Sequence, residues 1–303
     1  MSVRLLGVLV VPLVLLAVVI AGSRVLAANR LEGPPRAARL RAVASSTIAV
    51  LVALLFVIFS PWPAGDDVRL ATLPALAALV AVATAGIAEL TWPRPHGEHR
   101  EASITVRRQT EAATLTRLLV VGFASSALLL VVGAATAAAD GASVERRWDL
   151  GAVGAGPYPG IAYAVPVGLA LTALAIATWW ALGRVDARPA LGPDLDEVDR
   201  AIRLAARVRV LRFAATGALL TSAGLAATMG TALASLAQTL RMNWADAPRA
   251  PWDWIQNAGF ALIAVAVAGV VAAIVALLFD SPRVPAARES REQAEVPTRA
   301  VPE

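Results

Sequence analysis

Residues 213–240 read FAATGALLTSAGLAATMGTALASLAQTL and carry no charged side chain. A helix that crosses the hydrocarbon core of a bilayer needs about 20 apolar residues, because only hydrogen bonds within the segment satisfy its backbone where water is absent. This stretch exceeds that length, so we expect it to tilt or to extend beyond the core. It predicts a transmembrane helix and places the chain among integral membrane proteins.

Six more apolar stretches have the length of a membrane span. We therefore expect an all-α integral membrane protein of about seven transmembrane helices, which form one polytopic domain over residues 1–280. The charged, proline-containing residues 281–303 are expected to form a disordered cytoplasmic tail. The seven spans are expected at about residues 5–23, 43–60, 70–92, 118–139, 161–182, 213–240 and 257–279.

The composition restricts the chemistry of the chain. Of its 303 residues, 16% are charged, whereas about a quarter are charged in a soluble domain. The chain contains neither cysteine nor lysine, which excludes disulfides, thiolate ligands, Schiff-base lysines and the lysine of a P-loop. The GxSxG and HExxH motifs of hydrolases are also missing. We therefore expect no catalytic residues, no cofactor and no bound metal.

The arginines are distributed unevenly along the chain. Segments 24–41, 94–117, 184–212 and 283–299 hold 21 of the 27 basic residues, and the alternate segments hold six. Because basic loops stay on the cytoplasmic side, this bias predicts an outside N-terminus, an inside C-terminus and a multi-pass plasma membrane protein. The alternative is a signal peptide cleaved after Val25-Leu26-Ala27, which leaves six spans with their arginine-rich loops outside. The positive-inside bias favours seven spans.

The third and fourth spans resemble the fifth and sixth spans. Pro74 and Pro166 lie at matching places, and Arg-Pro pairs at 94–95 and 188–189 follow the two helices. Spans three and four cross the membrane in the same directions as spans five and six, so the similarity predicts a parallel repeat. Pro12 and Arg41 indicate a shorter third copy at the N-terminus. Alanine-rich helices align easily, so a chance likeness is the alternative.

The sixth span carries a polar seam, in which small and hydroxyl-bearing residues recur at spacings of three and four. This spacing places them on one face of a helix. One interpretation is close helix packing, and the other is the lining of a solute pathway. Packing is favoured, because no ionisable residue lies near the middle of any span. The polar seam consists of Gly217, Thr221, Gly224, Thr228, Thr231, Ser235 and Gln238.

Glu89 is the ionisable residue closest to the interior of a span. We expect it to be an interfacial carboxylate that pairs with an arginine such as Arg94 or Arg117, and the alternative is a proton relay or gating residue. His96 and His99, with neighbouring glutamates, form the only cluster that resembles a metal site. Their spacing fits no zinc motif and prolines flank them, so a solvated loop is favoured over zinc or manganese binding.

Residues 194–212 predict an amphipathic helix that runs into the sixth span. Val198 and Ile202 lie on its apolar face, and Asp199 with Arg203 forms an i,i+4 pair. Acidic residues begin the helix and arginines end it, as its dipole prefers. The basic end can bind anionic lipid headgroups or a cytoplasmic partner. Nucleic acid is not expected, because the membrane topology accounts for the arginine excess.

The outer segments are short, and residues 140–160 are too few for a folded domain. Tryptophans on this side predict an aromatic belt at the bilayer surface, and an external lipid or carbohydrate platform is the alternative. They are Trp62, Trp148, Trp244, Trp252 and Trp254.

The leading functional hypothesis is a non-enzymatic polytopic membrane protein, a permease-like or transport-associated subunit in a homo- or hetero-oligomer. The repeated hairpins, the polar seam and the amphipathic segment motivate it. The alternative is a self-contained transporter of a neutral or lipidic solute. A third hypothesis is a membrane enzyme that uses Glu89 or the His96 and His99 loop.

Overall fold

The computed structural model describes residues 66–91, 112–148, 151–188, 196–243 and 253–279, and a few isolated positions between 40 and 51. The expected span at 5–23 and the tail at 281–303 lie outside the described residues, and so does most of the expected span at 43–60. The number of spans and the orientation of the chain therefore stay predictions.

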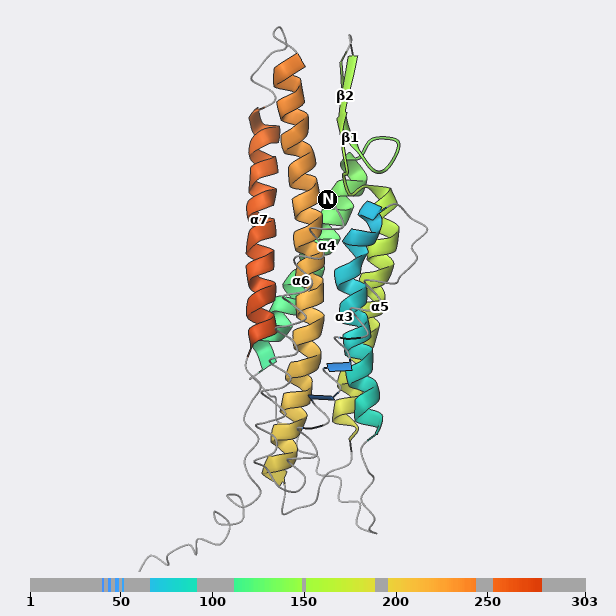
Figure 1. Cartoon of the computed structure of the whole chain (residues 1–303), viewed down its shortest axis with the longest axis vertical. Helices are drawn as coiled ribbons and strands as arrows, with labels where there is room; N and C mark the ends of the chain where they lie inside the picture. The colour runs from blue at the N-terminus through green and yellow to red at the C-terminus, as the bar shows by residue number, and fades with distance from the viewer. Residues whose placement is uncertain are drawn as a thin grey trace, which may run out of the picture.

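The described part of the chain contains five long helices. Most of them run along the long axis of the molecule, and α4 crosses behind α6 at an angle (Figure 1). All five are long and apolar enough to cross a membrane, so the expectation of a helical chain with several candidate membrane spans is confirmed for the described part of the chain. α6 begins well before the expected span at 213–240. The helices are α3 (Asp66–Leu90), α4 (Ala113–Thr136), α5 (Ile161–Asp186), α6 (Asp196–Asn243) and α7 (Asp253–Leu278).

α6 is the central helix of the bundle. It has 48 residues and is therefore roughly 70 Å long at 1.5 Å per residue, more than twice the thickness of a hydrocarbon core. It packs against α3, α4, α5 and α7. The expected amphipathic segment and the sixth span are thus one continuous helix, and its first turns extend past the expected membrane span.

Glycines bring neighbouring helices into close contact with α6. A Cβ atom on Gly230 would lie 2.7 Å from the carbonyl oxygen of Gly259 in α7, and a Cβ atom on Gly259 would lie 2.8 Å from the oxygen of Gly230. Gly122 of α4 lies against Ala218 in the same way. In lipid, such small residues allow the close van der Waals packing that holds helices together.

In the expected repeat, α3 is equivalent to α5, and α4 is equivalent to α6. The two helices of each equivalent pair are in contact. Gly86 of α3 lies against Trp180 of α5. Ser125 of α4 and Ser222 of α6 share a hydrogen bond of 2.7 Å. The helices that the repeat would make equivalent therefore pack on each other, and the duplication itself stays a prediction.

The segment between α4 and α5 contains an antiparallel hairpin of β1 (Val144–Trp148) and β2 (Gly151–Ala155). The expected all-α fold includes no strand there, so the hairpin is a correction to it. The hairpin lies at the end of the bundle opposite the first turn of α6 (Figure 1). Val144 is buried in a core cluster that includes Tyr158 and Leu236, and the guanidinium of Arg146 lies 5.9 Å from the ring centre of Trp254. The hairpin therefore packs on the ends of α6 and α7.

A short turn leads from α4 into this hairpin. The Asp140 carboxylate accepts hydrogen bonds of 3.0 Å from the backbone N–H groups of Ala142 and Ser143. The bond from Ala142 is the main cause of the lowered pKa of Asp140. Gly141 has a φ of 66°, a conformation that residues with a Cβ atom rarely adopt.

Candidate functional site

A group of buried charged side chains lies where α3, α5 and α7 end and α6 begins. The C-terminal carbonyl groups of a helix have no partner within the helix and carry a partial negative charge. The early turns of α6 run past these helix ends and present arginines to them. We call this group the arginine cluster; it consists of Glu89, Arg188, Asp199, Arg203, Arg209 and Arg212.

Arg203 attaches α6 to the end of α5. Its side chain donates to Oδ2 of Asp199 at 2.6 Å, to the backbone oxygen of Asp186 at 2.9 Å and to that of Arg188 at 2.7 Å. The i,i+4 pair of Asp199 and Arg203 that the sequence predicts is thus confirmed. Arg203 also satisfies carbonyl groups at the C-terminus of α5, which the sequence did not predict.

Arg212 attaches α6 to the end of α7 in a similar way. Its Nη1 donates to the backbone oxygens of Leu277 and Phe279 at 3.4 and 3.2 Å. The sequence predicts that the helix of residues 194–212 runs into the sixth span and that arginines at its end interact favourably with its dipole. The helix does continue, to Asn243, so these arginines do not lie at the C-terminus of their own helix. Two of these arginines instead interact with the C-termini of other helices.

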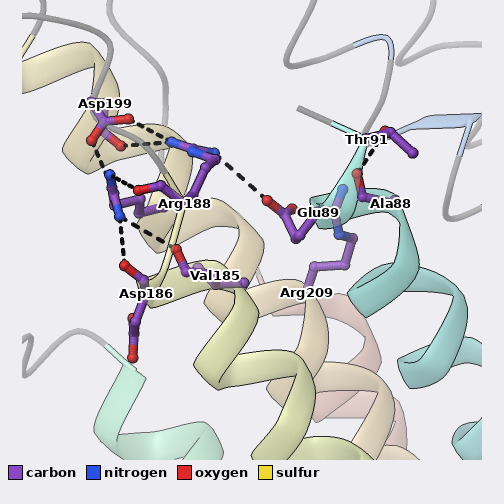
Figure 2. Close-up of polar contacts among 9 residues, drawn as sticks. Ala88, Glu89, Thr91, Val185, Asp186, Arg188, Asp199 and Arg209 are labelled. Carbon is purple, nitrogen blue, oxygen red and sulfur yellow. Dashed lines mark hydrogen bonds and ion pairs between the residues drawn. The ribbon is translucent and has the colours of Figure 1, made fainter. Parts of the chain in front are cut away.

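Glu89 attaches the last turn of α3 to both neighbours. Its side chain is 4% exposed; Oε1 accepts a hydrogen bond of 3.1 Å from Arg209, and Oε2 lies 3.8 Å from Nη1 of Arg188. Arg188 in turn donates to Oδ1 of Asp199 at 2.7 Å. Figure 2 shows Arg188 between Asp199 and Glu89, so one guanidinium connects the carboxylates of α6 and α3.

The expected pairing of Glu89 with an arginine is confirmed, but the partners are different residues. Arg117 is exposed on α4, and Arg94 lies outside the described residues. Arg209 is 120 residues away from Glu89 in the sequence, so only the packing of α3 on α6 identifies it. The sequence also gave no indication that Arg188, Arg209 and Arg212 would be buried.

The charges of the arginine cluster partly compensate one another. Two carboxylates oppose four guanidinium groups; the C-termini of α3, α5 and α7 each contribute about half a negative charge, and the N-terminus of α6 contributes about half a positive charge. Burying charged groups is costly unless they are paired and hydrogen-bonded. Removing one partner of a buried pair costs about 3–5 kcal/mol. The cluster can therefore hold three helix ends against α6, and its integrity depends on each charged member.

The polar seam is divided between a buried and an exposed part. Gly217 is buried against Ala78 and the backbone oxygen of Pro74 in α3, and Thr221 is 1% exposed. Thr228 is half-buried. The remaining members, Gly224, Thr231, Ser235 and Gln238, are exposed in the part of the chain that the structure describes.

The threonines of the seam bond to their own helix. Thr221, Thr228 and Thr231 each donate a hydrogen bond of 2.8–3.1 Å to the carbonyl oxygen four residues earlier. The hydroxyl hydrogens are thus used within α6, while the hydroxyl oxygens keep acceptor capacity. Gly217 thus makes a packing contact with α3, and Thr221 is buried in the bundle.

His96 and His99 lie outside the described residues. Among the residues that are described, no group of three histidine, cysteine, aspartate or glutamate residues is suited to hold a metal ion. Comparisons of the chain with known protein families, curated proteins and solved structures find no match. The interpretation of the arginine cluster and the polar seam therefore depends on their geometry.

Proposed function

We propose that this protein is a non-enzymatic, permease-like or transport-associated subunit of the plasma membrane, which associates with another membrane helix through the exposed part of its polar seam. One observation carries the proposal. Gly224, Thr231, Ser235 and Gln238 are exposed on α6, although α6 is otherwise mostly buried by its neighbours. Small and hydroxyl-bearing residues are typical of helix interfaces in lipid.

Two comparisons within the chain support this assignment. Gly217 and Gly230 lie on the same helix and each is covered by a neighbouring helix, whereas a Cβ atom on Gly224 would meet no atom within 4 Å in the described part of the chain. The outward surfaces of α4 and α7 instead carry branched apolar side chains such as Val131 and Val267. Those surfaces suit lipid, and the exposed seam suits a partner helix.

The proposal is tested by placing a photo-reactive amino acid at Ser235 in the full-length protein in native membranes. Val267 on α7, which is 60% exposed, is the matched control. We expect a covalent product with a membrane protein or with a second copy of the chain from position 235, and lipid adducts alone from position 267. Products from both positions, or from neither, would contradict the proposal.

The alternative function is a self-contained transporter of a neutral or lipidic solute. The same exposed seam motivates it, because an open polar surface within a span can line a pathway. Two results together would favour the transporter. Position 235 would give no cross-linked protein product, and liposomes that contain only this chain would take up the solute. An enzyme that uses Glu89 is the least favoured function, because two arginines hold the Glu89 carboxylate.

A further inference from the structure

We propose that Glu89, Arg188 and Arg209 form a charge latch, which closes α3 onto α5 and α6 and which opens locally when Glu89 loses its negative charge. The latch goes beyond the proposed function, because it requires neither a partner nor a solute. It is a conformational device at the end of the bundle where α3 and α5 end.

The latch depends on a carboxylate that lies between two like charges. Arg188 and Arg209 are 5% and 7% exposed, and both contact the carboxylate of Glu89. While Glu89 is ionised, it attracts both guanidinium groups. Without that charge, Arg209 has no carboxylate partner among the described residues, while Arg188 keeps its ion pair with Asp199. A buried guanidinium without a partner gains free energy by reaching water, and this favours separation of the helices.

α3 is the element that the latch holds. In the described part of the chain, the Glu89 side chain joins the last turns of α3 to other helices through polar contacts, whereas Thr84 and Thr91 bond to carbonyl groups of α3 itself. The apolar contacts beside it include small side chains, such as Ala85 of α3 and Ala181 of α5, and the larger Trp180 of α5. Burying a charge without its partner is costly, so loss of the Glu89 charge is expected to weaken the packing at this end although the apolar contacts remain.

The other attachments of the arginine cluster do not involve α3. Arg203 connects α6 with α5, and Arg212 connects α6 with α7. These contacts remain when Glu89 is neutralised. In addition, Pro74 lies inside α3, where a proline removes one backbone hydrogen bond and allows the helix to bend. Opening is therefore expected to be confined to the end of α3 beyond Pro74.

The absence of cysteine from the chain allows a direct test. The reporter is Ala181→Cys, which is fully buried on α5 and lies against Gly86, one turn before Glu89. A second reporter is Ala85→Cys on α3, in case the first variant is poorly produced. The control reporter is Ala226→Cys, which is fully buried on α6 in the core cluster near the hairpin. Each is made in the full chain and treated with a small maleimide in membranes.

We expect Glu89→Gln to raise the labelling rate at position 181 at least tenfold and to leave position 226 unchanged. Glu89→Gln preserves the shape of the side chain, so packing stays the same. Adding Arg209→Gln removes the excess charge and should return labelling toward its original rate. No increase at position 181, equal increases at both positions, or no recovery in the double variant would each overturn the latch.

Discussion

Arg203 provides the most direct measure of what the arginine cluster contributes to stability. Its guanidinium donates to a carboxylate at 2.6 Å and to backbone oxygens at 2.7 and 2.9 Å. Each hydrogen bond of a charged group contributes about 1.5–3 kcal/mol, but the three bonds share one side chain and do not add independently. The side chain of Arg203 is also 20% exposed, so water offsets part of the loss.

We therefore expect Arg203→Met to lower the free energy of unfolding by about 3 kcal/mol, near the lower end of the range for broken buried pairs. Arg207→Met is the matched control, because it removes the same charge one turn later on the same helix. Arg207 pairs with Asp186 at 3.0 Å, but the two side chains are 32% and 55% exposed. An exposed pair of this kind contributes about 0–1 kcal/mol.

The assay is equilibrium unfolding in mixed micelles with increasing denaturing detergent, followed by the helical signal in circular dichroism. The reasoning is refuted if Arg203→Met costs less than about 1 kcal/mol, below the range for a buried pair. It is also refuted if Arg207→Met is equally destabilising. Either result would mean that capping the α5 carbonyl groups does not stabilise the fold.

At the crossing of α6 and α7, Gly230→Ala should cost about 1–3 kcal/mol in the same assay, because its Cβ atom would meet the Gly259 oxygen at 2.7 Å. The control is Gly224→Ala, whose Cβ atom would meet no atom within 4 Å in the described residues and which should be neutral or slightly stabilising. Equal losses of unfolding free energy in the two variants would contradict the close contact of α6 with α7 at Gly230. The predicted orientation can be tested with single cysteines at Ser143 and Ser290. An impermeant thiol reagent should react with the first from outside and with the second from inside, and the reverse pattern would show that the predicted orientation is wrong.

The arginine cluster changes how the positive-inside bias is interpreted. The sequence predicts that the arginines of residues 184–212 act as topological signals, and this role stays a prediction. In the folded chain, however, Arg188, Arg203, Arg209 and Arg212 are engaged with helix ends and carboxylates. Binding of anionic headgroups by this segment, which stays a proposal, therefore depends on exposed members such as Arg200.

The sequence alone determined the features that belong to single segments. Hydropathy identified the helices that are described, because transfer into lipid depends on the composition of about 20 consecutive residues. The local spacing of Asp199 and Arg203 identified their ion pair, because i,i+4 neighbours share one helix face. The same helical periodicity predicted that the residues of the polar seam lie on one face of a helix.

Only the tertiary structure decided which segments meet. It placed Arg209 against Glu89, divided the polar seam into buried Gly217 and exposed Gly224, and packed the hairpin on α6 and α7. The strands of the hairpin were missed because Gly151–Ala155 is short and consists mostly of glycine and alanine, which are poor strand formers. Partners of buried charges depend on how distant helices pack, and helical periodicity within one segment carries no information about that packing.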